Sequence, residues 1–194
     1  MNEQKYRDLF ESMKPGFFAE EGIRSIADDL CFEEMILPLT GDQDLSEPLP
    51  GACGSTVLPL PPNVTFGYYE GDFDELMTQV ARVVPAWPNC FAPSDRVYCS
   101  AIDGKLASFC IVEDMGSHHF DGKQCKIGGP GCVGTLPEYR RMGIGLAMVR
   151  DVTEILRSEG YDYSYIHYTG VSHWYQKLGY QTILRWNNKG YMIN

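Results

Sequence analysis

The sequence predicts an α/β fold, and two features of the 194 residues favour it. The first is an amphipathic helix that follows Gly143 and ends before Gly160, with Arg157 in its last turn. The second is a series of segments with strand character on both sides of this helix. The composition, with 44% hydrophobic and 12% aromatic residues, is typical of an ordered globular protein. The apolar face of the helix consists of Ile144, Ala147, Met148, Val152, Ile155 and Leu156.

Composition also excludes several classes of protein. No apolar run is long enough to span a bilayer, and the first residues lack the hydrophobic core of a signal peptide, so we expect a cytoplasmic protein that binds no membrane. The net charge of −10 argues against a nucleic-acid partner. The seven cysteines are scattered without a Cys-x-x-Cys pair, so neither a metal site nor a disulfide framework is predicted. The chain is long enough for one full core, and whether it forms a homodimer is left open.

Residues 1–62 are predicted to be an N-terminal extension, packed on the main domain or bordering its acceptor cleft. The pattern predicts a helix over 2–14 and a second helical piece over 23–30. Residues 32–39 are either a strand or an extended cover. Residues 40–62 are rich in Pro, Gly, Asp and Ser, which is typical of a loop.

The main domain is predicted over residues 63–194. Its first helix is expected after Asp72, with Glu75 three residues on as in a capping box, and Asp103-Gly104 predicts a tight hairpin. The expected elements are, in order, strand 64–69, helix 73–84, strands 96–102 and 105–112, a polar connection over 113–124, strand 125–135, the main helix, strand 161–168, a short helix over 171–178 and a hairpin of 181–186 with 190–193. The run Gly128 to Gly131 inside its strand indicates a bulge, a splay from the neighbouring strand or a surface loop.

The stretch Arg140-Arg141-Met142-Gly143-Ile144-Gly145 lies where the main helix begins. A helix N-terminus carries unpaired N–H groups and partial positive charge, and glycine lets the backbone approach an anion closely. Two arginines add donors that match a phosphate. The stretch is therefore either a diphosphate-binding loop or a surface turn with two solvated arginines.

This stretch resembles the Arg/Gln-x-x-Gly-x-Gly/Ala loop of the GNAT superfamily of N-acetyltransferases, and a second match lies at Trp174 to Tyr180, which resembles the family's aromatic-Tyr-x-Lys-Leu-Gly-aromatic segment. The resemblance extends from about Arg96 to the C-terminus. It implies the GNAT fold, a mixed central sheet flanked by helices, here with an added N-terminal helical segment. It also implies acetyl-CoA as co-substrate without a metal, and direct acetyl transfer to a primary amine of a small molecule or peptide.

The resemblance assigns roles to particular residues. Tyr175 occupies the position of the acid that protonates the departing sulfur, although a packed tyrosine would give the same pattern. Tyr168 stands where many relatives have an asparagine that contacts the cofactor. The residues implied to bind the cofactor are Val133, Thr135, Arg140, Arg141, Met142, Gly143, Ile144, Gly145 and Leu146.

The general base is less clear, because strand 125–135 lacks the glutamate that many relatives carry there. Glu113, at the end of the preceding strand, is our candidate. The alternatives are a water chain or one of Asp114, Glu70, Asp72, His118 and His119. Cys132 beside the expected pantetheine slot raises the idea of a covalent intermediate, but the family's direct transfer favours a packing role.

Two other classes of function remain open at this stage. The first is a non-catalytic acyl-CoA-binding or regulatory module, which would keep the loop but lack a general base. The absence of a carboxylate in strand 125–135 favours this alternative, and the presence of Tyr175 argues against it. A protein–protein module would use residues 1–62 to bind a partner. We favour the enzyme.

Overall fold

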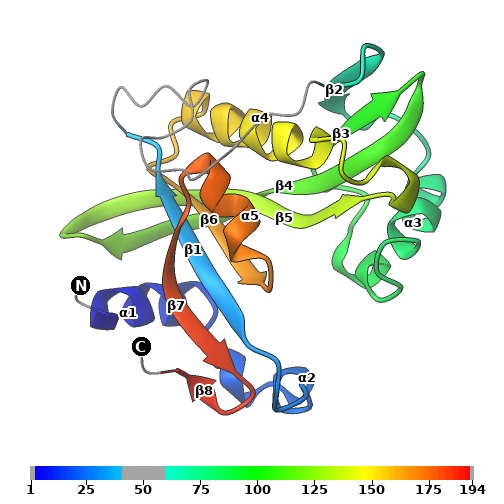
Figure 1. Ribbon diagram of the computed structural model, residues 1–194. Coiled ribbons are helices and arrows are strands. Elements are labelled where there is room, and N and C mark those ends of the chain that lie inside the picture. The colour runs from blue at the N-terminus through cyan, green and yellow to red at the C-terminus, as the bar shows by residue number, and fades with distance from the viewer. Residues whose placement is uncertain (1–2, 41–59, 193–194) are drawn as a thin grey trace. The chain divides into compact units, whose positions relative to one another are not determined.

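The computed structural model describes residues 3–40 and 60–192 (Figure 1). The predicted loop over 40–62 lies almost entirely outside the described residues. The helices are α1 (Glu3–Met13), α2 (Glu21–Arg24), α3 (Phe73–Ala81), α4 (Ile144–Ser158) and α5 (Ser172–Tyr175), with single 3₁₀ turns η1 (Phe17–Ala19), η2 (Trp87–Cys90), η3 (Pro137–Tyr139) and η4 (Gln176–Leu178). The strands are β1 (Phe32–Pro38), β2 (Val64–Tyr68), β3 (Val97–Ile102), β4 (Lys105–Phe120), β5 (Lys123–Thr135), β6 (Tyr163–Thr169), β7 (Gln181–Asn187) and β8 (Gly190–Tyr191).

The strands form one mixed sheet in the order β2-β3-β4-β5-β6-β1-β7-β8. β5 and β6 are parallel, paired through Ile127 with Tyr163 and Gly128 with Ser164, whereas β1 runs antiparallel to both of its neighbours. The predicted α/β fold, with a mixed sheet, flanking helices and an N-terminal helix, is confirmed. Residues 32–39, left open as strand or cover, form β1 between β6 and β7. No helix in the described ranges is long and apolar enough to cross a membrane.

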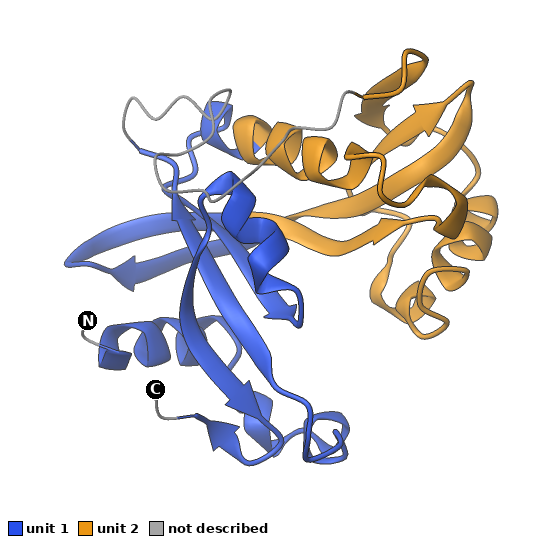
Figure 2. Ribbon diagram, in the orientation of Figure 1, with its two compact units in different colours: residues 1–52, 114–128, 156–194 blue, residues 53–113, 129–155 orange. Residues whose placement is uncertain are grey.

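The chain forms two compact units, shown in Figure 2. Unit 1 comprises residues 1–52, 114–128 and 156–194, and unit 2 comprises residues 53–113 and 129–155. Each unit has its own buried core. That of unit 1 includes Leu9, Phe10, Phe17, Ile36, Phe120, Ile127, Tyr165, Leu184 and Trp186, and that of unit 2 includes Leu76, Val80, Phe91, Val97, Phe109 and Ile111. The predicted boundary between residues 62 and 63 stays a prediction.

In unit 2, helices cover both faces of β4. Leu76 and Val80 of α3 belong to the same buried cluster as Phe109. The preceding residue, Ser108, points to the opposite face and donates a hydrogen bond to Met148 Sδ of α4 at 3.3 Å. The start of α3 is as predicted, because the Asp72 side chain accepts a hydrogen bond from the Glu75 N–H at 2.9 Å.

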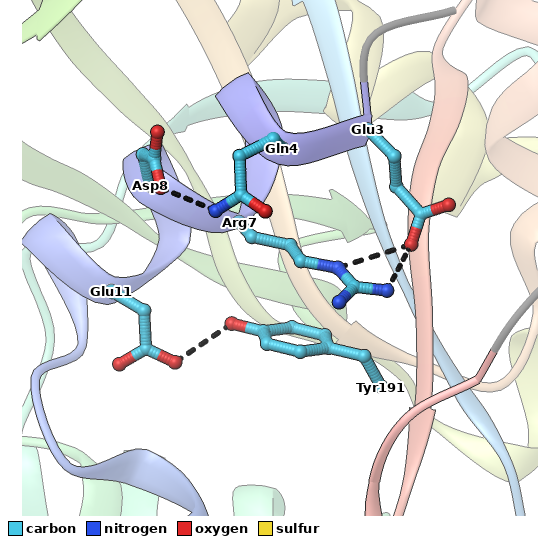
Figure 3. Close-up of polar contacts among 6 residues, drawn as sticks. All are labelled: Glu3, Gln4, Arg7, Asp8, Glu11 and Tyr191. Atoms are coloured by element: carbon cyan, nitrogen blue, oxygen red, sulfur yellow. Dashed lines mark hydrogen bonds and ion pairs between the residues drawn. The ribbon is translucent and has the colours of Figure 1, made fainter.

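In unit 1, α1 packs its apolar side into the core through Leu9 and Phe10, which are almost fully buried. Its polar side contacts β8, as Figure 3 shows: Tyr191 donates a hydrogen bond to Glu11 at 2.8 Å, and the Arg7 guanidinium lies over the Tyr191 ring at 4.8 Å. Burial and the Glu11 carboxylate raise the pKa of Tyr191 well above its usual value, so this phenol stays a hydrogen-bond donor at neutral pH.

The polar connection predicted over 113–124 is wrong. β4 continues through Phe120, and a second tight turn at Asp121-Gly122 leads directly into β5. Both turn residues have positive φ, 53° and 82°, as a two-residue hairpin requires. Phe120, the last residue of β4, is buried in the core of unit 1. The polar residues before it therefore belong to a strand and not to a loop. The helical piece predicted over 23–30 is also wrong, since α2 ends at Arg24.

Candidate active site

The predicted phosphate loop lies in unit 2 at the start of α4. Arg141 and Gly143 both have left-handed backbone conformations, with φ of 65° and 75°, and α4 begins at Ile144. Arg140 Nε donates to the Thr135 carbonyl at 3.1 Å, which closes the loop onto the end of β5. The Ala147 N–H donates to the Gly143 carbonyl at 3.1 Å and is the first bond of the helix.

This geometry leaves donors for a ligand. The first N–H groups of a helix lack partners within it, and together they act as about half a positive charge. The side chains of Arg140 and Arg141 are exposed, whereas Ile144 and Met148 are buried and anchor the helix. The loop therefore combines a fixed backbone with accessible positive charge, which suits an anion such as a diphosphate.

An ion pair from Arg82, the C-cap residue of α3, supports the loop. Arg82 Nη2 lies 2.8 and 3.0 Å from the two carboxylate oxygens of Glu138, which belongs to the 3₁₀ turn before the loop. The backbone of Glu138 and the Arg82 guanidinium lower the pKa of this carboxyl group. Glu138 is thereby kept ionised and paired two residues before the loop arginines.

The structure brings Glu113 together with β5. A Cβ atom on Gly131 would overlap Oε1 of Glu113, so the carboxyl group lies directly against the backbone of the strand at this glycine. The next glycine of the strand, Gly134, is covered in the same way by the Phe109 ring. Val133 and Thr135 lie between and after these close approaches and are partly exposed. Glu113 thus places a carboxylate against β5, a strand that contains no Asp or Glu of its own.

Cys132 follows Gly131 and has a positive φ of 48°. Burial, then the neighbouring Cys90 and Glu113, raise the pKa of the Cys132 thiol to about 12. A thiol with such a pKa is protonated at neutral pH and is a poor nucleophile. The burial and the raised pKa of Cys132 therefore favour a packing role over a covalent intermediate.

Tyr175, the predicted acid, belongs to unit 1, whereas the loop and Glu113 belong to unit 2. It ends α5, is nearly buried, and packs edge-on against Trp174 and Tyr180 with ring centroids 4.9 and 6.0 Å away. This packing fixes the ring of Tyr175 at a helix end.

Comparison with protein families identifies the domain. Residues 93–182 match the model of the acetyltransferase (GNAT) domain. These residues of the chain therefore form a domain of the GNAT superfamily. A comparison with curated proteins finds no match. Members of this superfamily in general transfer acetyl groups, with acetyl-CoA as donor and an amine as acceptor.

Solved structures share the fold at low sequence identity. The GCN5-related glucosamine N-acetyltransferase region of a fungal multi-domain GH3 β-N-acetylglucosaminidase is 20% identical with a TM-score of 0.55, over 82% of this chain and 20% of that one. A GCN5-related N-acetyltransferase from Sphaerobacter thermophilus is 18% identical with a TM-score of 0.52, over 80% of this chain and 49% of that one. This GNAT chain thus spans a fifth of the fungal protein and half of the bacterial one.

The alternative base candidates of this GNAT chain have other contacts. Asp72 caps α3, and Asp114 accepts a hydrogen bond from the Gly116 N–H at 2.9 Å. The His118 ring contacts the Met115 carbonyl at 2.7 Å and Ser12 Oγ at 3.0 Å, which ties α1 to β4. These contacts give Asp72, Asp114 and His118 structural roles, while His119 is exposed.

Sequence reasoning missed Glu34, a fully buried carboxylate in unit 1. It contacts His167 and Trp186, and it accepts a hydrogen bond from the backbone N–H of Tyr168. Tyr168 has a φ of 57° and its side chain is 37% exposed. The signal available in the sequence was a charged residue directly before the apolar run that begins at Met35.

Proposed function

We propose that this chain transfers an acetyl group from acetyl-CoA directly to a primary amine of a small molecule or peptide. The observation that carries the proposal is the loop before α4, with left-handed Arg141 and Gly143, two exposed arginines and a helix N-terminus. Family membership supplies the reaction type, and the acceptor is our inference.

We assign the cofactor-binding role to the loop and the end of β5. Backbone N–H groups from Gly143 to Leu146 would hold the diphosphate, and Arg140 and Arg141 would neutralise it. Val133 and Thr135, partly exposed on β5, would hold the pantetheine arm. Bound acetyl-CoA supplies an electrophilic thioester carbonyl.

We assign Glu113 as a base and Tyr175 as the acid. A primary ammonium must lose a proton before its nitrogen can attack a carbonyl, and a carboxylate against β5 is suited to receive a proton from that nitrogen. The close approach of Glu113 to Gly131 supports this role, because it compensates for the glutamate that β5 lacks. A phenol at the position of Tyr175 can protonate a departing thiolate.

The net charge of −10 agrees with a cationic acceptor. The fungal structure is that of a glucosamine N-acetyltransferase region, so amino sugars belong in a panel of trial acceptors beside aliphatic amines, aromatic amines and peptide N-termini.

The test is a thiol-release assay with acetyl-CoA and this amine panel, in parallel with calorimetric titration of CoA. Release of CoA that depends on one class of amine supports the enzyme. Binding of CoA without turnover of any amine would instead support the non-catalytic acyl-CoA-binding module. Absence of CoA binding would overturn both.

A further inference from the structure

Two cysteines of unit 2 come together between the turn η2 and the strand β5. Cys90 is the last residue of η2, and Cys132 lies in the second half of β5. Their side chains form a hydrogen bond with each other. Cys90 is exposed and Cys132 is partly exposed. Both residues belong to unit 2, so the contact lies within one compact unit.

Packing around the pair holds the turn against the strand. Trp87 of η2 and Cys132 of β5 pack against the same buried cluster, and Phe91, which directly follows Cys90, is a member of that cluster. The turn thus lies on the core of unit 2 with Cys90 at its exposed end. Because an exposed thiol buries little apolar area, packing accounts for the position of Cys132 but not for that of Cys90.

The backbone of β5 is strained at Cys132. Its φ of 48° lies in the left-handed region, which costs free energy in a residue other than glycine. Residues in such conformations gather at functional sites, where they direct a side chain that a regular strand would place elsewhere. The side chain at this strained position is the thiol that contacts Cys90.

We propose that Cys90 and Cys132 form a reversible disulfide bond, and that closure of this bond lowers acetyl transfer by the chain. The effect on transfer rests on the function proposed above, whereas the bond itself does not. The oxidant is a small-molecule disulfide. Exchange with such a disulfide requires one accessible sulfur and a second thiol close to it, and the pair provides both.

The exchange balances in two steps. The thiolate of Cys90 attacks one sulfur of the small disulfide, so that an S–S bond to Cys90 forms and the other small sulfur leaves as a thiolate. Cys132 then loses its proton to water, and its sulfur attacks that of Cys90 and releases the second small thiolate. The two protein thiols are oxidised by two electrons. The small disulfide is reduced by the same two electrons to two thiols, which take up the two protons.

The order of attack follows from the surroundings of the two thiols. Burial, the neighbouring Cys90 and Glu113, and the hydrogen bond to Cys90 raise the pKa of the Cys132 thiol, so Cys132 is a poor nucleophile while Cys90 is free. The causes that act through the Cys90 thiol disappear once that sulfur is bonded to another sulfur. The pKa of Cys132 therefore falls at the stage where its thiolate is needed.

Closure of the bond would alter the strand to which we assign the pantetheine arm. Cys132 lies between Gly131, whose backbone the Glu113 carboxyl group approaches, and Val133, which we assign to the arm. A disulfide holds its sulfurs about 2.0 Å apart, closer than hydrogen-bonded thiols, so the turn or the strand must shift when the bond forms. A misplacement of about 1 Å at a reaction site is enough to lower turnover by about 10²-fold.

The first arm of the test needs neither an acceptor nor acetyl-CoA. The full-length protein is incubated with oxidised glutathione, and its peptides are mapped by mass spectrometry without reduction. We expect a peptide pair joined through Cys90 and Cys132, which lacks two hydrogen atoms relative to the reduced peptides and separates in dithiothreitol. Cys90 found only as a glutathione adduct, or joined to another of the seven cysteines, would overturn the proposal.

Variants make this arm specific. Cys90→Ser should abolish the joined pair and, because the residue is exposed, should leave the fold intact. The matched control is Cys99→Ser, which changes another cysteine of unit 2 and should retain the joined pair. Loss of the pair in Cys99→Ser would contradict the assignment of the bond to Cys90 and Cys132.

The second arm measures acetyl transfer with the most active amine of the panel. The acetylated amine is detected by its mass, because a thiol reagent would also react with the protein. We expect oxidised glutathione to lower the rate of wild type and of Cys99→Ser at least about tenfold, and dithiothreitol to restore it. The rate of Cys90→Ser should not respond. A bridged wild type that keeps its full rate would overturn the effect on acetyl transfer.

The two arms separate this proposal from the one on which it rests. If acetyl transfer itself is wrong, the reduced wild-type protein fails with every amine, while the bond between Cys90 and Cys132 still forms. If the disulfide is wrong, the reduced protein turns over and no joined peptide pair appears.

Discussion

The loop before α4 in unit 2 and the surroundings of Glu34 in unit 1 differ in whether their charged groups are exposed to solvent or buried in the protein. In unit 2 the arginines of the proposed phosphate loop are exposed. The same loop leads into the first turn of α4, whose N–H groups have no partner within the helix. In unit 1 the Glu34 carboxylate is completely buried, and its hydrogen-bond donors come from the protein itself. The first arrangement suits a ligand that comes and goes. The second suits a partner held permanently, which here is the ring of His167.

The largest expected effect is on stability. Replacement of Glu34 with Ala removes the acceptor of the buried Trp186 Nε1–H and of the part-buried Tyr168 N–H, and should lower the free energy of unfolding by about 3–5 kcal/mol. Urea denaturation monitored by tryptophan fluorescence would measure it.

The neighbouring residue supplies the control. Glu33 pairs with Arg185 at 2.7 Å and accepts a hydrogen bond from Thr182, and the side chain of that arginine is 51% exposed while that of Glu33 is 13% exposed. Because the partner charge stays in solvent, Glu33→Ala should cost less than Glu34→Ala, about 1–2 kcal/mol. Equal losses in the two variants would show that Glu34 is no special buried site.

The second prediction concerns Tyr175. Replacement with Phe removes only the hydroxyl group and keeps the ring packed against Trp174 and Tyr180. We expect kcat to fall by about 10²-fold, with CoA affinity nearly unchanged. Steady-state kinetics beside calorimetry would decide it, and unchanged kcat would remove Tyr175 from the mechanism.

How far the sequence predicts these features depends on whether local chemistry determines them. The proposed phosphate loop is a contiguous stretch, so the helix start at Ile144 could be predicted from it. The Asp103-Gly104 turn was predicted for the same reason. Asp121-Gly122 is an equal signal, but the polar residues before it masked the strand.

Glu34 could not be predicted, because its partners are more than 130 residues away along the chain. Only the pairing of β1 between β6 and β7 brings them together. The approach of Glu113 to Gly131 depends likewise on how β4 and β5 lie in the sheet. Long-range register thus decides the parts of the candidate site that sequence motifs leave open.

The third prediction tests the position of the Glu113 carboxyl group without altering it. In Gly131→Ala the new Cβ would overlap the Glu113 carboxylate and displace it, while the φ of Gly131 permits alanine. We expect kcat to fall about tenfold, which corresponds to about 1.4 kcal/mol. Gly67→Ala is the matched control, since its Cβ would meet no atom within 4 Å. If both variants turn over equally, the position of Glu113 is irrelevant to catalysis.

The smallest expected effect is a pH-dependent change in the free energy of unfolding, caused by Asp162 in unit 1. The Lys123 ammonium, 2.8 Å away, and then the Lys126 N–H lower the pKa of Asp162. A lowered pKa means that this carboxylate stabilises the fold above the usual carboxyl pKa of about 4, and that the contribution disappears as the pH falls through the lowered value. Asp162→Asn should therefore cost about 0.5–1 kcal/mol at pH 7 and less at pH 3. A loss that is the same at both pH values would contradict this.

The most direct test of the account is calorimetric titration of CoA into Gly143→Leu and Gly104→Leu. The two glycines have nearly the same φ, 75° and 74°, so the substitutions impose similar backbone strain, but only Gly143 lies in the phosphate loop. The account predicts that the Kd for CoA rises about tenfold or more, at least about 1.4 kcal/mol, in Gly143→Leu and stays at the wild-type value in Gly104→Leu. Wild-type affinity in Gly143→Leu would contradict the assignment of this loop as the cofactor site.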